Sequence, residues 1–282
     1  MKIDNQDRRL IEKELVEQGI VLSAYKSIRG ARRQHIAYVS LPVTTGQRYF
    51  ETLRHEGVFT ATEFEKKVGT GSFYELVIKP NIREGVALAD KLGHKKNLLF
   101  IAPSIFDARK WNWSQDTYMS LWYAVIGELA GAHYLQSGWE YSLGSVKEIF
   151  FSNLMRWGII RPFTKQFAID AFGLSYLQTG LTRDEEWREF EAMRNIKIFE
   201  SSGEELRIDK AISLCVKAII NLKQWGFPCQ ELLSLAYRLM QIPVLSVGQW
   251  GDCLCRRDFD SDIYHEARRQ LQLLMFESKP SF

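Results

Sequence analysis

From His35 to about residue 162 the chain alternates short apolar runs with segments of helical periodicity, and this alternation restricts the fold more than any other feature. The apolar runs, each short enough for a buried strand, are residues 36–43, 97–106, 132–138 and 159–163. The helical patterns between them are residues 81–93, 117–131 and 143–158. Strands joined by such helices predict a parallel sheet with right-handed crossovers, the doubly wound or flavodoxin-like α/β architecture.

The rest of the chain divides around this unit. Residues 1–34 form an N-terminal arm with a short helix at 4–18, residues 35–162 form the α/β domain, and residues 163–282 are expected to form a mostly helical domain. In this last part, two patterns are typical of a helix start, Thr182–Glu185 and Ser202–Glu205. The predicted helices are residues 206–222, 230–241 and 261–276. The apolar segment 73–78 ends at Pro80, and an extra strand and part of a lid remain alternatives for it.

Composition excludes several classes of protein. The formal charge of +3 is too small to indicate a dedicated nucleic-acid binder. No apolar run approaches the roughly 20 residues that cross a bilayer, and the polar N-terminus lacks a signal-peptide core, so we expect a cytoplasmic protein without membrane contact. The spacing of Cys253, Cys255 and His265 is only weak evidence for a metal site. We therefore expect reduced thiols, no metal and no cofactor.

Ligands of open parallel sheets bind outside the carboxyl ends of the strands, so the residues that follow each apolar run are the candidates. The end of the first run and the turn after it carry small and hydroxylated residues followed by a cation; they are Ser40, Thr44, Thr45, Gly46 and Arg48. Their backbone N–H groups and the guanidinium suit a phosphate or a ribose. An ordinary turn followed by an exposed arginine is the alternative interpretation.

The second run is followed by an aromatic loop that contains Trp111, Trp113 and Asp116. The tryptophans are suited to stacking on a base and Asp116 to hydrogen-bonding it, although the rings could equally plug the edge of the sheet. The third run is followed by Ser142, Gly144, Ser145 and Glu148. Ser142 is expected to cap the following helix, and Gly144 to allow a ligand to approach closely.

Glu148 is the candidate reacting group. A carboxylate that projects from this helix toward the strand ends can attack the anomeric carbon of a ribosyl group, or stabilise the charge that develops as a base departs. The alternative is an acidic residue that merely favours a helix N-terminus.

Two segments carry a resemblance to a known family. Tyr38-Val-Ser-Leu-Pro42 and Gly138-Trp139-Glu140-x-Ser142-x-Gly144-Ser145-x-x-Glu148 resemble the nucleoside 2-deoxyribosyltransferases and the related 2-deoxynucleoside 5-phosphate N-hydrolases, over about residues 35–160. The resemblance implies a nucleophilic carboxylate at Glu148, positioned by the Tyr38 hydroxyl, with Thr45, Gly46 and Arg48 facing the sugar or its phosphate. Leu41 stands where the family often has Gly, and Ser142 where many members have Asp.

The leading functional hypothesis is therefore an N-glycosidase or ribosyl transferase that acts through Glu148 on a nucleoside, a nucleotide or an NAD-like molecule. The alternative is a nucleotide-binding sensor without turnover, whose helical domain engages a protein partner; the absence of Asp at position 142 motivates it. An interaction protein with a vestigial site is a third hypothesis. The resemblance also implies a homodimer.

Overall fold

A four-stranded parallel sheet lies at the centre of the molecule. The computed structural model describes residues 35–96, 98–103, 113, 115–157, 194–250 and 260–277, with 13, 17, 19–24 and 27 of the N-terminal arm. The strands are β1 (Ile36–Ser40), β2 (Leu99–Ile101), β3 (Ala132–Leu135) and β4 (Lys197–Glu200), in the order β2-β1-β3-β4. The predicted parallel α/β sheet is confirmed, and its first three strands follow the first three apolar runs.

Strand β1 is buried along its whole length because helices cover both faces of the sheet. Ala37 and Val39 pack on one face with Ala89 and Leu92 of α4 (Lys79–Lys96). On the other face, Ile36 and Tyr38 join a larger core that includes α5 (Gln115–Ala124), its π-helical extension η5 (Val125–Leu129) and α6 (Leu143–Arg156). The alternation of successive side chains in β1 therefore sends Tyr38 and Ser40 toward α6.

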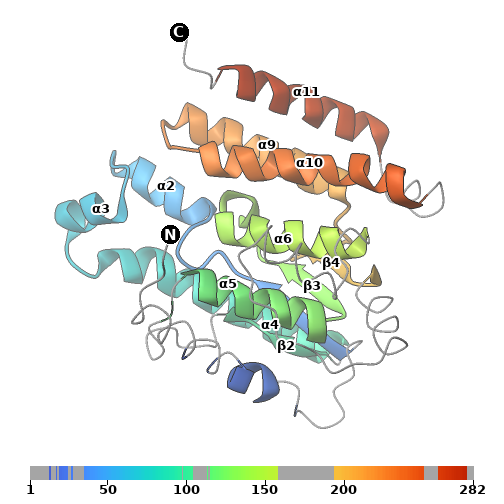
Figure 1. The fold of residues 1–282 in the computed structure, drawn as a ribbon. Helices are drawn as coiled ribbons and strands as arrows, with labels where there is room; N and C mark the ends of the chain where they lie inside the picture. Colours follow the sequence, from blue (N-terminus) through green and yellow to red (C-terminus); the bar gives the residue numbers. More distant parts are fainter. Residues whose placement is uncertain are drawn as a thin grey trace.

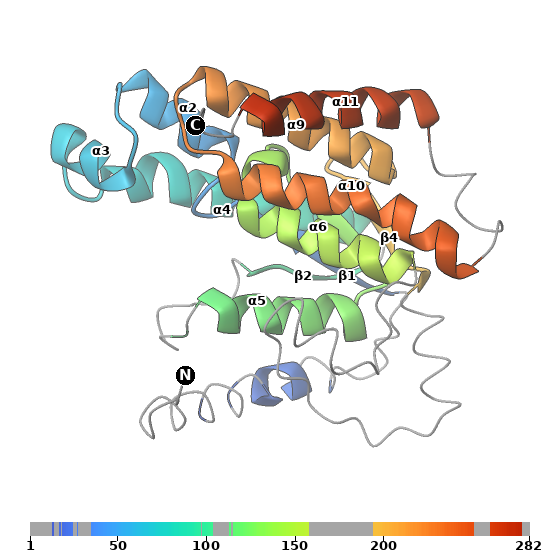
Figure 2. The same cartoon turned by 45° about the horizontal axis from the view of Figure 1, so that its top comes forward.

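Three further helices form an outer layer above α6 (Figures 1 and 2). These are α9 (Ile208–Gln224), α10 (Gln230–Trp250) and α11 (Ser261–Glu277). All three were predicted, but α10 continues through Pro243 beyond its predicted end at residue 241. Gly226, with φ of +81°, follows α9, as expected for a residue that ends a helix. The buried residues of these helices belong to the same core cluster as those of α6, so the outer layer is continuous with the sheet unit.

Strand β4 was not predicted and lies within the range expected to form the helical domain. It pairs in parallel with β3, placing Lys197 beside Ala132 and Glu200 beside Leu135. The strand has four residues, and only Ile198 is fully buried, so it leaves no apolar run in the sequence. The predicted strand at 159–163 and the pattern at Thr182–Glu185 lie outside the described residues.

The pattern Ser202–Glu205 does not start a helix, because α9 begins at Ile208. The Ser202 hydroxyl accepts a hydrogen bond from the backbone N–H of Glu204 at 3.2 Å. Glu205 forms a β-bridge with Phe199 and an ion pair of 2.8 Å with Arg156. The prediction was wrong because Ser and Glu at this spacing also suit a turn that returns along a strand.

The segment 73–78 is helical and is not an extra strand; a role as part of a lid remains a prediction. Residues Tyr74–Ile78 form a π-helical turn, η2, that continues directly into α4, with the N–H of Lys79 bonded to the carbonyl of Tyr74. Pro80 has no N–H for an ordinary helical bond, and the wider turn before it accommodates that break. Gly93, expected to end the helix, lies inside it, since α4 continues to Lys96.

Two unpredicted helices separate β1 from η2. They are α2 (Gln47–His55) and α3 (Ala61–Val68), and Thr60 with Glu63 forms a capping box at the start of α3. At the N-terminus, residues 19–24 are helical and extend beyond the predicted end at 18, with Val21 and Leu22 buried in the core.

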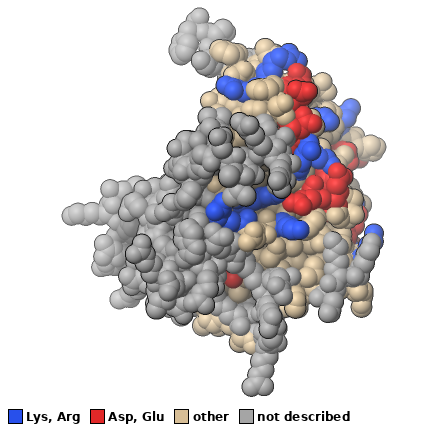
Figure 3. Space-filling model, turned by 90° about the vertical axis from the view of Figure 1, so that its right-hand side faces the viewer, with Lys and Arg blue, Asp and Glu red and all other residues tan. Residues whose placement is uncertain are grey.

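The described surface carries charges of both signs. Figure 3 shows Lys and Arg side chains next to Asp and Glu side chains on the described part of one face. Several are paired directly, such as Lys210 with Glu200 at 2.9 Å and with Glu204 at 3.2 Å. Among the described helices, none is long and apolar enough to cross a membrane.

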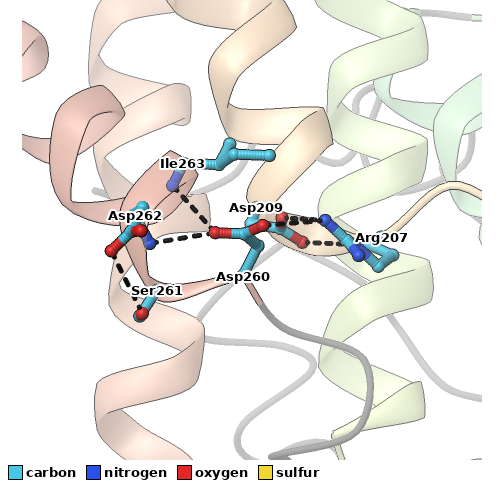
Figure 4. A network of polar contacts seen from close by, with 6 residues as sticks. All are labelled: Arg207, Asp209, Asp260, Ser261, Asp262 and Ile263. Carbon is cyan, nitrogen blue, oxygen red and sulfur yellow. Dashed lines mark hydrogen bonds and ion pairs between the residues drawn. The ribbon is translucent and has the colours of Figure 1, made fainter.

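A charge network joins the first turns of α9 and α11 (Figure 4). Arg207 donates to both carboxylate oxygens of Asp209, Nε to Oδ1 at 3.2 Å and Nη2 to Oδ2 at 2.9 Å. Asp209 is fully buried, and Arg207 also lies 3.8 Å from Asp260. Asp260 in turn accepts the backbone N–H groups of Asp262 and Ile263, which start α11.

We expect Arg207→Ala to lower the free energy of unfolding by about 2–3 kcal/mol, because it leaves the buried Asp209 carboxylate without the guanidinium that binds it. Urea denaturation followed by circular dichroism measures this. Arg269→Ala is the control, since Arg269 pairs with Glu266 on the exposed side of α11, where water screens the charges, and its loss is expected to change the stability far less. Equal effects of the two substitutions would contradict a special role for the network.

Candidate functional site

The strand order places a topological switch point at β1. From β1 the chain passes to β2 on one side and then returns to β3 on the other side. The connections leave the carboxyl ends of β1 and β3 in opposite directions, and ligands of open α/β sheets bind at such points. Ser40 ends β1 and Leu135 ends β3, and Gln136 follows directly.

The carboxylate of Glu148 meets two hydroxyls of β1 beside this point. Tyr38 donates its hydroxyl to Glu148 Oε1 at 2.6 Å, and Ser40 donates its own to Oε2. Tyr38 and Ser40 lie two residues apart and therefore on the same face of the strand, toward α6. Glu148 lies in the second turn of α6 and is only 5% exposed. The predicted approach of Glu148 to the first strand is thus observed.

Burial raises the pKa of the Glu148 carboxyl to about 7, although the hydroxyls of Ser40 and Tyr38 act in the opposite direction. Desolvation destabilises the charged form, whereas hydroxyls that donate to the carboxylate stabilise it. The carboxyl therefore exchanges its proton near neutral pH, which is the range in which a group can serve either as an acid or as a nucleophile.

His133 lies next to Tyr38 on the neighbouring strand. The two rings meet edge to face with their centroids 5.3 Å apart, and His133 Nδ1 lies 2.9 Å from the hydroxyl of Ser152 on α6. Burial lowers the pKa of His133 to about 3, so the imidazole is neutral at physiological pH. His133 consequently adds no positive charge that would stabilise the Glu148 carboxylate and lower its pKa.

The loop after β1 is tied to the start of α6. Thr45 donates its hydroxyl to Ser142 Oγ at 3.1 Å, and Ser142 caps α6 by accepting the N–H of Ser145 at 3.4 Å. Gly46 has φ of +106°, and a Cβ built there would lie 2.5 Å from the Cβ of Pro42. Only glycine fits this position, which lets the loop fold tightly against the β3–α6 connection.

Arg48 lies on α2 and is paired with groups of α4. It donates to Asn81 Oδ1 at 2.7 Å and forms an ion pair with Glu84. Asn81 is itself oriented by donating to the carbonyl of Pro42 at 2.7 Å, and Glu84 accepts from Gln136 Nε2 at 3.3 Å. Arg48 therefore already has an anionic partner, rather than being an open cation for a phosphate.

The other predicted residues are placed as follows. Thr44 is exposed, and Ser145 is buried with a hydroxyl that bonds no other described residue. A Cβ at Gly144 would meet only Ser142 Oγ, at 3.9 Å, so no described neighbour requires glycine there. Trp113 is buried, lies with its ring tilted against that of Tyr118 and donates Nε1 to Glu17 of the N-terminal arm at 2.6 Å. Trp111 and the Asp116 side chain lie outside the described residues.

Four residues of the site were not predicted: Asn81, Glu84, His133 and Gln136. Gln136 directly follows a strand, so the rule of strand ends could have identified it. Asn81 and Glu84 lie in the first turns of α4, and only the path of the chain after β1 brings them to Arg48. His133 is hidden within an apolar strand, where a sequence pattern gives no sign of its neighbours.

The described residues contain no group of three or more His, Cys, Asp or Glu side chains that could hold a metal ion. Cys253 and Cys255 lie outside that part of the chain. No family model, no curated protein and no solved structure matches the sequence or the fold.

Proposed function

We propose that the protein is an N-glycosidase or ribosyl transferase that cleaves the base–sugar bond of a nucleoside, a nucleotide or an NAD-like molecule through Glu148. One observation carries the proposal: the buried carboxylate of Glu148 binds the hydroxyls of Tyr38 and Ser40 beside the switch point of the sheet. The strand order agrees with the first four strands of a flavodoxin-like sheet, in which ligands bind between β1 and β3.

The chemistry follows from the ionisation of Glu148. The ionised carboxylate attacks the anomeric carbon, and the base leaves with the electron pair of the C–N bond and takes a proton from water. A water molecule, or a second base in a transferase, then displaces the carboxylate from the sugar. Tyr38 holds Oε1 during this exchange, so that Oε2 is the oxygen that attacks after Ser40 releases it.

A nucleotide sensor without turnover is the second candidate. Both oxygens of Glu148 are occupied in this structure, and Ser142 supplies no second carboxylate. The helices α9 and α10 pack on α6 and its preceding turn η6 (Trp139–Tyr141), where Asn221 donates to the Tyr141 hydroxyl at 2.6 Å. A ligand that shifted α6 would thus act directly on the outer helices. The homodimer and the protein partner remain predictions.

Incubation with a panel of purine and pyrimidine nucleosides, their 5′-monophosphates and NAD, followed by chromatography for free base, tests the proposal. We expect base release from at least one member. Thermal stabilisation by a member that releases no base would favour the sensor instead, because a ligand that binds only the folded state raises its stability. If no member of the panel releases base and no member stabilises the protein, both candidates are contradicted.

A further inference from the structure

The pairing of Arg48 bears on which substrates reach the site. Arg48 is the basic residue that follows the β1 loop, and its guanidinium binds Asn81 at 2.7 Å and the Glu84 carboxylate. The Arg48 side chain is 33% exposed and that of Glu84 is 54% exposed, so both face solvent at the edge of the site. A ligand that approached Arg48 would therefore meet Glu84 as well.

A continuous series of hydrogen bonds connects this pair with Glu148. Ser40 donates its side chain to Glu148, and its carbonyl accepts the N–H of Gln136 at 3.1 Å. Gln136 then donates its side-chain amide to Glu84 Oε2 at 3.3 Å. The ion pair thus lies beside the carboxyl ends of β1 and β3, the edge of the sheet at which Ser40 binds Glu148.

Glu84 changes what Arg48 can bind. A phosphate dianion near Arg48 would have to displace a carboxylate that is held by both the guanidinium and Gln136, or remain beside that negative charge. A neutral hydroxyl meets no such repulsion, and the free edge of a carboxylate accepts it readily. Asn81 cannot rotate away to offer a replacement donor, because its amide N–H group is bonded to the carbonyl of Pro42.

We propose that Glu84 is a specificity-determining residue that keeps phosphate away from Arg48 and so selects a nucleoside with a free sugar hydroxyl over its phosphorylated form. This inference rests on the proposed function for the identity of the ligand. Its electrostatic part, the exclusion of phosphate by Glu84, does not depend on turnover and is tested separately.

Calorimetric titration with inorganic phosphate tests the electrostatic part. Glu84→Gln removes the charge but retains an oxygen that Arg48 and Gln136 can bind, and we expect phosphate to bind this variant about tenfold more tightly than the wild type. Glu75→Gln is the matched control, because Glu75 is similarly exposed and also pairs with a cation, Lys79, away from the site. The double variant Arg48→Gln, Glu84→Gln should lose the gain.

The same variants are then compared with 2′-deoxyadenosine and its 5′-monophosphate. We expect Glu84→Gln to shift the ratio of binding affinities about tenfold toward the monophosphate, and the ratio of base-release rates likewise if base is released. Equal phosphate affinity in the wild type, Glu84→Gln and Glu75→Gln would overturn the inference, whatever the activity. Absence of base release together with tighter phosphate binding by Glu84→Gln would instead contradict the proposed function and leave the exclusion of phosphate supported.

Discussion

Glu148→Gln is expected to reduce base release at least about a thousandfold, the largest effect that a single substitution should have on this protein. The amide has nearly the same shape as the carboxyl and can accept the Tyr38 hydroxyl, so the packing of α6 on β1 is retained. It carries no negative charge, however, and is a poor nucleophile toward an anomeric carbon. Chromatographic rates for wild type and variant, at saturating nucleoside, measure the loss.

The control for this substitution is Glu140→Gln. Glu140 lies in η6, eight residues before Glu148, and burial also raises its pKa, but no described contact joins it to Tyr38 or Ser40. We expect this control to keep most of the activity. A Glu148→Gln protein that is folded and as active as Glu140→Gln would remove Glu148 from the chemistry.

The second large effect is on stability. The pKa of Glu148 is raised from 4.5 to about 7 in the folded protein, so between these pH values the unfolded chain has lost a proton that the folded chain retains. The stability that this group contributes is full below about pH 4.5 and falls as the pH rises toward 7, by about 3 kcal/mol. Glu148→Gln has no such titration, so its stability relative to wild type should increase over this range.

Urea denaturation of both proteins at pH 5, 6, 7 and 8 measures this difference. His133 titrates oppositely: its depressed pKa means that stability is lost as the pH falls below about 6.5 toward 3. Because His133 is present in both proteins, its contribution cancels in the comparison. A difference between wild type and Glu148→Gln that does not change with pH would show that the carboxyl has an ordinary pKa, contrary to its burial beneath α6.

The sequence was sufficient to predict the parts of the sheet in which burial is continuous. Ile36–Ser40 is buried on both faces and therefore reads as an unbroken apolar run, and α6 carries both a capping serine and a wide apolar face. Strand β4 lies at the end of the sheet order, with Lys197 exposed, and its pairing with β3 depends on contacts distant in sequence. Such a short strand leaves no local pattern.

The site was predictable to a similar extent. Glu148 was expected to project toward the strand ends, and the family resemblance implied that the Tyr38 hydroxyl positions it; the two side chains do meet. Ser40 was predicted to bind a phosphate or a ribose, and its bond to Glu148 was not predicted. Arg48 was predicted to bind a phosphate or a ribose because a cation that follows a turn of small residues is typical of such a site. Its actual partner, Glu84, is 36 residues away, and only the folding of α2 against α4 brings the two charges together.

In the proposed reaction the Glu148 carboxylate itself attacks the sugar. A nucleoside with fluorine at the 2′ carbon should trap this step, because fluorine slows the breakdown of the sugar–carboxylate ester. After incubation, proteolysis and mass spectrometry, we expect the peptide containing Glu148 to have gained the mass of the fluorinated sugar, with one equivalent of base released. Base release with the sugar attached to another residue, or with the Glu148 peptide unmodified, would contradict it.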